Sequence, residues 1–189
     1  MEKLFFLEEL EELFTAVQIS GIFADQKIFA DCIPNAPAAT ILEEYRKQKQ
    51  ENDFDLSAFV ATHFQVPSYN ETNFISDISL SAQQHIEQLW DVLTINSNTQ
   101  KGTVIGLPFS YVVPGGRFRE LFYWDSYFTM LGLQASGKTL LVENMVNNFA
   151  YLLNTFGHIP NGTKTYFLSR SQPPFFSLMV DLLSEDKGN

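Results

Sequence analysis

The residues best suited to chemistry lie in one segment, Pro114 to Tyr127, with the sequence PGGRFRELFYWDSY. Its Pro-Gly-Gly start places a rigid residue before two permissive ones, which lets the backbone approach another group closely. Arg117 and Asp125 then stand among closely spaced aromatic residues. A neutral polyol needs this mixture, because its ring faces pack on aromatic planes while its hydroxyl groups need fixed donors and acceptors. The composition fits equally well an aromatic core turn in which Arg117 pairs with Asp125 or Glu120.

A second pattern, GLQASGKT at Gly132–Thr139, matches the phosphate-binding loop G-x-x-x-x-G-K-[ST] at every defined position. The apolar run from Leu178 to Asp181 even imitates a magnesium-binding strand. Such a loop must follow a buried parallel strand, however, and the preceding WDSYFTMLGL contains a single β-branched side chain. A parallel sheet also needs several strands joined by helices, whereas the segments upstream have helical spacing. We therefore interpret the pattern as a Ser-Gly turn between two helices, with a nucleotide-binding protein as the remote alternative.

The segment from Pro114 to Tyr127 resembles the first signature of the trehalase family, P-G-G-R-F-x-E-x-Y-x-W-D-x-Y. Phe122 stands where the signature has Tyr, which keeps the ring and loses a hydroxyl group. Further segments are similar to bacterial trehalases and extend the resemblance from Phe23 to about Leu183. They are FADQKIFADCIPNA (Phe23–Ala36), FDLSAFV (Phe54–Val60), GHIPNG (Gly157–Gly162) and SRSQPPFF (Ser169–Phe176).

The resemblance implies a set of sugar-binding residues drawn from three of these segments. In the family, the arginine of PGGRF, the Trp-Asp pair, the asparagine of HIPNG and the RSQ run contact the disaccharide. The corresponding residues here are Arg117, Trp124, Asp125, Asn161, Arg170, Ser171 and Gln172. Their chemistry is appropriate, since guanidinium and amide groups are planar donors and an indole ring can stack on a pyranose face.

The resemblance also implies an activity, the inverting hydrolysis of α,α-trehalose to two glucose molecules, without a cofactor. Inversion needs two carboxyl groups about 6.5–9.5 Å apart, one as acid and one as the base that activates a water. In the family both follow SRSQPPFF, one in S-G-W-D and one near Q-W-D-x-P, and neither string occurs here. We therefore name no catalytic residue and expect a fragment that holds part of the sugar site and is inactive alone. A non-catalytic sugar-binding or regulatory remnant is the alternative.

Composition narrows the choice of partners. The net charge of −10, from twelve basic and twenty-two acidic residues, argues against nucleic acid or an anionic membrane surface as a partner. Cys32 is the only cysteine, so no internal disulfide or cysteine-based metal site is expected. The glutamate-rich start does not resemble a signal peptide, and no apolar run reaches the length of a membrane span. We expect a cytoplasmic protein whose partner is trehalose or a related small sugar.

Helical spacing of apolar residues dominates the chain, and turn residues separate the helical segments. We expect helices at residues 7–20, 35–49, 55–63, 81–93, 125–133, 138–156 and 174–183, and a loop at 95–117. A further short segment around 25–32 stops at Pro34. Asp53 or Asp55 is expected to cap the helix at 55–63, Ser79 or Ser81 the helix at 81–93, and Gly157 to end the helix at 138–156.

Together these features predict an all-α fold, a partial (α/α)6 toroid built as an incomplete barrel of antiparallel helix pairs. We expect residues 1–189 to form a single domain, the truncated N-terminal part of a trehalase catalytic domain. An incomplete ring leaves apolar helix faces uncovered, so we also expect self-association through those faces.

Overall fold

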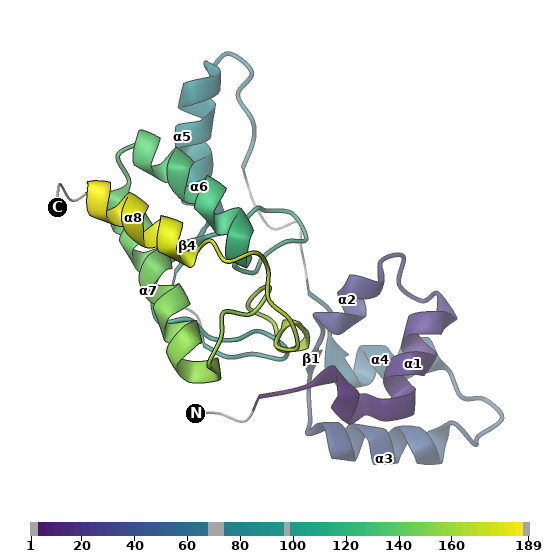
Figure 1. The fold of residues 1–189 in the computed structure, drawn as a ribbon. Coiled ribbons are helices and arrows are strands. Elements are labelled where there is room, and N and C mark those ends of the chain that lie inside the picture. Colours follow the sequence, from purple (N-terminus) through teal and green to yellow (C-terminus); the bar gives the residue numbers. More distant parts are fainter. Residues whose placement is uncertain (1–3, 68–73, 97–98, 187–189) are drawn as a thin grey trace. The chain divides into compact units, whose positions relative to one another are not determined.

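A computed structural model of the chain describes residues 4–67, 74–96 and 99–186 (Figure 1). The chain forms two compact units. Unit 1 comprises Met1–Ser68 with Gln100–Ile105, and unit 2 comprises Tyr69–Thr99 with Gly106–Asn189. The expectation of a single domain over residues 1–189 stays a prediction.

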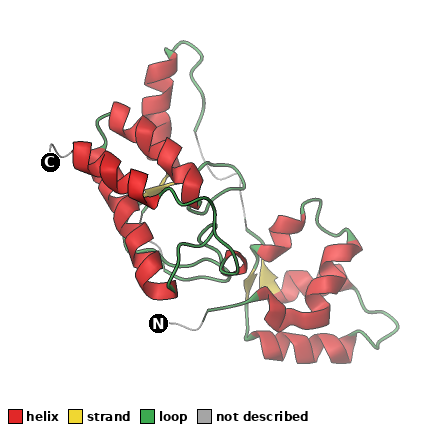
Figure 2. Cartoon of the chain, viewed as in Figure 1, coloured by secondary structure: helices red, strands yellow, loops and turns green. Residues whose placement is uncertain are grey.

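Helices make up most of the secondary structure, which confirms the all-α prediction and is consistent with part of a helical toroid (Figure 2). The α-helices are α1 (Glu11–Ser20), α2 (Gln26–Ala30), α3 (Ala38–Gln48), α4 (Leu56–His63), α5 (Ala82–Leu93), α6 (Tyr123–Ala135), α7 (Thr139–Phe156) and α8 (Phe176–Asp186). Two 3-10 helices are η1 (Leu7–Leu10) and η2 (Thr165–Phe167). In the described part of the chain no helix has the length and apolar character needed to cross a membrane.

The strands are short and pair in two antiparallel ribbons. In unit 1, β1 (Ile33–Pro34) pairs with β2 (Phe64–Gln65). In unit 2, β3 (Thr94–Ile95) pairs with β4 (Tyr111–Val112). The second ribbon lies partly within the segment that we predicted as a loop at 95–117, because pairing of distant residues leaves no periodic signal in so short a strand.

Three α-helices begin with a side-chain cap, namely α2 and α4 in unit 1 and α5 in unit 2. Asp25 Oδ1 accepts a hydrogen bond from the Lys27 N–H at 2.9 Å, and Asp55 Oδ1 accepts one from the Ser57 N–H at 2.8 Å. Asp55 is therefore the cap of α4 and Asp53 is not, which decides between the two candidates in the sequence. Ser81 likewise caps α5, in a reciprocal capping box with Gln84.

The core of unit 1 combines aliphatic and aromatic side chains and contains Cys32, which is 1% exposed. The buried residues are Leu10, Leu13, Val17, Phe29, Cys32, Ala38, Ile41, Leu42, Tyr45, Phe59, Val60 and Phe64. Desolvation by burial raises the pKa of the Cys32 thiol to about 12, and the charge of Asp31 adds to this effect. The thiol therefore stays protonated at neutral pH, and its role is to fill the core.

Unit 2 centres on α6, α7 and α8, which pack against one another (Figure 1). The buried faces of α6 and α7 carry apolar residues at helical spacing, such as Met130, Leu133, Met145, Phe149 and Leu152. Gly157, at φ 76°, ends α7 in the left-handed conformation, as the sequence predicts.

An ion-pair cluster on the surface of unit 1 connects α1 to α3. The Arg46 guanidinium donates to Glu12 Oε1 at 2.8 Å and to Glu11 Oε2 at 2.6 Å, and Lys49 Nζ lies 3.4 Å from Glu12 Oε1. The hydrogen bond from Arg46 is the largest cause that lowers the pKa of Glu12 from 4.5 to about 2. The ionised form of Glu12 is therefore favoured in the folded chain.

This pKa shift predicts an acid-sensitive contribution to stability. Because the folded pKa is depressed, the contribution is present above pH 4.5 and is lost as the pH falls toward about 2. We expect Glu12→Gln to lower the thermal midpoint at pH 6, and this difference from the wild type to shrink between pH 4.5 and 2. Thermal melts followed by circular dichroism measure this difference in midpoint at each pH. Glu8→Gln, outside the cluster, is the control, and an equal pH dependence of the two variants would contradict the assignment.

Candidate functional site

Three segments of unit 2 that are distant in sequence are joined by backbone hydrogen bonds. The Tyr123 N–H donates to the Asn161 carbonyl at 3.1 Å, and the Asn161 N–H donates to the Arg170 carbonyl at 2.9 Å. The Thr163 N–H donates to the Leu121 carbonyl at 3.1 Å, while the Leu121 N–H donates to Thr163 Oγ1 at 3.0 Å. Residues 121–123, 161–163 and 170 therefore lie side by side.

The N-terminus of α6 lies at this junction and receives its cap from another segment. The N-cap residue, Phe122, has no side chain that can accept a hydrogen bond. Instead, Gln172 Oε1 accepts the Trp124 N–H at 3.0 Å, and Gln172 Nε2 donates to Asp125 Oδ2 at 3.2 Å. Asp125 lies in the first helical turn, where the helix dipole favours a negative charge. One glutamine thus fixes both residues of the Trp-Asp pair.

Three other predicted residues make contacts within unit 2, Ser171 with a backbone carbonyl group and Arg117 and Arg170 each with an aromatic ring. Ser171 Oγ donates to the Ile159 carbonyl at 2.6 Å, which fixes the RSQ run to the HIPNG segment. The Arg170 guanidinium lies over the Phe167 ring at 5.1 Å, and that of Arg117 lies over the Phe118 ring at 5.0 Å. Ring contacts from Phe118 through Phe122 to Phe167 connect the two arginines.

A cluster of four aromatic side chains lies beside the N-terminus of α6. Its members are Trp124, Tyr127, Phe128 and Phe175. Phe128 and Phe175 contact each other, and each contacts Trp124 and Tyr127, with ring centroids 5.3 to 6.2 Å apart. Trp124 is 38% exposed and Phe128 is 55% exposed, so part of this surface is open to a ligand. Sequence reasoning missed Phe128, Phe167 and Phe175, because a single phenylalanine in a helical or irregular segment carries no signal that separates surface from core.

The predicted site residues differ in their exposure. Arg117, Trp124, Asp125, Arg170 and Ser171 are exposed, and Asn161 and Gln172 are partly buried. Glu120, one of the two carboxylates proposed as a partner for Arg117, is 2% exposed. Across the described ranges, no three His, Cys, Asp or Glu residues are grouped so that they can hold a metal ion.

The pattern GLQASGKT forms the end of α6, a turn and the start of α7. The Lys138 N–H donates to the Leu133 carbonyl at 2.8 Å, and Gly137 has φ 66°. Lys138 Nζ lies 3.9 Å from carboxylate oxygens of both Glu87 and Asp91. The segment before this turn is a helix where a nucleotide loop requires a strand, so the pattern is the interhelical turn that we preferred.

Unit 2 thus presents a polar junction flanked by exposed aromatic rings within an all-α fold. The sequence matches the trehalase family over residues 21–188. The chain belongs to the trehalase family. Among solved structures it is similar to neutral trehalase from Saccharomyces cerevisiae, with 44% sequence identity and a TM-score of 0.41. That match covers 42% of this chain and 14% of the yeast chain.

The cap that Gln172 supplies leads to a first test of this site. Gln172→Leu removes both hydrogen bonds, and we expect it to lower the free energy of unfolding by about 1–2 kcal/mol, since each contributes about 1 kcal/mol. Gln172→Glu keeps an acceptor for the Trp124 N–H but sets a carboxylate against Asp125, so its effect should depend on pH.

Urea unfolding curves at pH 7 and pH 4 compare the two variants. Equal stability of Gln172→Leu and the wild type would show that the N-terminus of α6 does not need this cap.

Proposed function

We propose that this chain is part of an inverting α,α-trehalase and carries a portion of its sugar-binding site. The proposed substrate is trehalose or a related small sugar, with no cofactor, and the proposed location is cytoplasmic. The proposed binding residues are Arg117, Trp124, Asp125, Asn161, Arg170, Ser171 and Gln172, within a domain that spans residues 1–189.

The observation that carries this proposal is the pair of hydrogen bonds made by Gln172. They place the Trp-Asp pair of the signature against the RSQ run, although 47 residues separate Asp125 from Gln172. A sugar-binding site needs donors and acceptors that are already fixed, because ordering them on binding costs affinity. The exposed indole of Trp124 supplies the apolar face beside them.

The proposed roles follow from the chemistry of each group. Asp125 keeps acceptor capacity beyond the bond from Gln172, since a carboxylate can accept several hydrogen bonds, and is suited to sugar hydroxyls. The two guanidinium groups donate in fixed planes, and Asn161 offers an amide. Ser171 already donates to the Ile159 carbonyl, so in this proposal it acts as an acceptor or through the backbone.

Hydrolysis requires more than these residues. Inversion needs an acid and a base on opposite sides of the glycosidic bond. Asp125 is engaged with Gln172 at the start of α6, which suits substrate contact, and the S-G-W-D and Q-W-D-x-P strings are absent from this sequence. We therefore propose that the chain binds trehalose and, when tested alone, does not hydrolyse it.

Titration calorimetry with trehalose tests the proposal. We expect saturable heat in the millimolar range, and roughly tenfold to hundredfold weaker binding by Asp125→Asn, because a hydrogen bond to a charged group is worth about 1.5–3 kcal/mol. Asp181→Asn, on the exposed side of α8, is the matched control and should bind like the wild type.

A coupled glucose assay on the same samples should show no release of glucose. The absence of heat at millimolar trehalose would contradict the proposed sugar site. Release of glucose by this chain would contradict the proposal that it lacks the catalytic acid and base.

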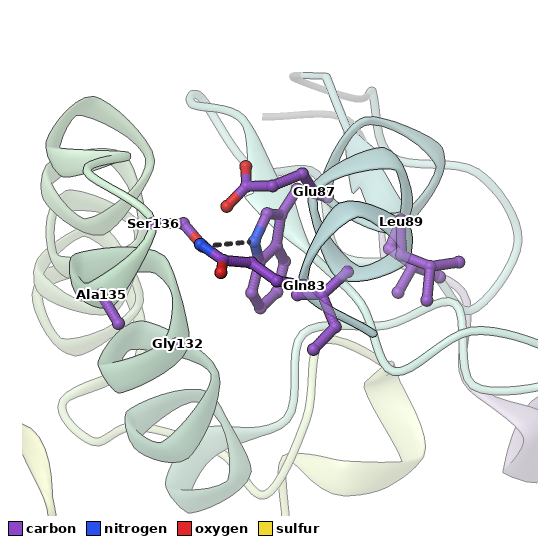
Figure 3. Close-up of a pocket in the computed structure, with 9 residues that line it drawn as sticks. Gln83, Glu87, Leu89, Gly132, Ala135 and Ser136 are labelled. Atoms are coloured by element: carbon purple, nitrogen blue, oxygen red, sulfur yellow. Dashed lines mark hydrogen bonds between the residues drawn. The ribbon is translucent and has the colours of Figure 1, made fainter. Parts of the chain in front are cut away.

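We further propose that unit 2 self-associates through uncovered faces of α5 and α6. Alpha5 has an apolar stripe but no buried residue, and its Ile86 is 46% exposed. A groove of about 580 Å³ is lined by this stripe, by Gly132 and Ala135 of α6, and by Ser136 just after α6 (Figure 3). The Trp90 Nε1–H donates to Ser136 Oγ at 3.0 Å within it. Phe128 and Leu131 extend the exposed apolar surface along α6.

Sedimentation velocity at increasing concentration tests this surface. We expect the weight-average sedimentation coefficient of the wild type to rise, and Ile86→Glu combined with Leu131→Glu to remove the rise, because charges at both faces oppose burial. Ile78→Glu, at a side chain that is 98% exposed outside the groove, is the control. A single monomeric species of the wild type at all concentrations would rule out the proposed association.

A further inference from the structure

A continuous chain of ring contacts connects two arginines of the candidate site. The Arg117 guanidinium lies 5.0 Å from the centroid of Phe118, and the rings of Phe118 and Phe122 meet edge to face at 5.8 Å. Phe122 in turn contacts Phe167 at 5.6 Å, and Phe167 carries the Arg170 guanidinium at 5.1 Å. Residues from the signature and from the region around η2 are thereby linked through side chains.

The backbone is shaped to make room for these rings. Gly162 forms an isolated bridge with Phe122, and a Cβ atom on Gly162 would lie 3.0 Å from Phe167 Cδ2 and 3.3 Å from Phe122 Cδ1. Gly115, at φ 98°, exchanges two backbone hydrogen bonds with Phe118, at 3.0 and 3.2 Å. The absence of a side chain at Gly162 is therefore a condition for the contact between Phe122 and Phe167.

Such a chain restricts the motion of the exposed arginines. Edge-to-face pairs of rings attract each other beyond the burial of their apolar area, and a cation is attracted to the face of an aromatic ring. A long guanidinium side chain otherwise loses rotamer entropy when a ligand orders it. A phenylalanine side chain has only two torsion angles, so the three rings are the rigid part of this arrangement. The longer arginine side chains at its two ends are the flexible part.

We propose that Phe167 is a positioning residue that orders Arg117 as well as Arg170, acting on Arg117 through Phe122 and Phe118. The two arginines then present their N–H groups to sugar hydroxyls as a coupled pair. The identity of the ligand rests on the proposed trehalose site, whereas the coupling of the two arginines rests on the ring contacts alone.

Arginine side-chain NMR tests the coupling without any sugar. In Phe167→Leu we expect the Nε–Hε resonance of Arg170 to move, since the ring beneath it is lost. We also expect the resonance of Arg117 to move, although two ring contacts and one guanidinium–ring contact separate it from Phe167. Phe167→Tyr keeps the ring and should leave both in place. Phe109→Leu, a change at a residue that is 41% exposed outside the ring chain, is the control for loss of a phenylalanine.

The reverse experiment uses the exposed end of the chain, where a substitution disturbs the fold least. Phe118 is 40% exposed, and we expect Phe118→Leu to move the resonance of Arg170. An Arg117 resonance that is unchanged in Phe167→Leu, or an Arg170 resonance that is unchanged in Phe118→Leu, overturns the proposal.

Trehalose titration then measures the effect on binding. We expect Phe167→Leu to bind about fivefold more weakly than the wild type and Phe167→Tyr to bind normally. Equal binding by Phe167→Leu and the wild type overturns the positioning role. If the wild type gives no saturable heat, the proposed sugar site fails, while the NMR comparison still decides whether Phe167 couples the arginines.

Discussion

The first turn of α6 must find hydrogen-bond acceptors outside its own sequence, and the candidate site is organised by this requirement. A helix leaves its first N–H groups unpaired, and the side chain of Phe122 at the N-cap position cannot accept a hydrogen bond from them. The carbonyl of Asn161 and the side chain of Gln172 supply the missing acceptors. Two loops are therefore held against one helix end, and the polar groups proposed to bind sugar are ordered as a result.

The same groups consequently serve the fold and the proposed ligand. Gln172 has an acceptor and a donor, and both are engaged with α6, while Asn161 contributes its backbone to the cap and leaves its side chain for other contacts. A substitution of Gln172 can change stability as well as sugar affinity, so the two effects have to be measured separately. Asp125 and Arg117 lie at exposed positions, where a substitution disturbs the fold less. The site is thus preorganised by bonds that exist without a ligand.

Helical periodicity and terminal residues were sufficient to predict most of the helices. Gly157 ends α7 and Ser81 caps α5, because these residues act through local backbone geometry. Alpha6 begins at Tyr123, two residues before the predicted Asp125, since its cap is supplied from a distance and Phe122 gives no local signal. The residues of the site were predicted through resemblance to a family, and the ring contacts of Phe167 and Phe175 depend on tertiary packing that no local pattern encodes.

The position of Cys32 makes one part of the chain separately observable. It is the only cysteine in the sequence and lies in the core of unit 1, with its thiol kept protonated by burial. A thiol reagent can modify it only when that core opens, so the rate of alkylation reports how often unit 1 opens. Because unit 2 contains no cysteine, events at the proposed sugar site do not contribute directly to that signal.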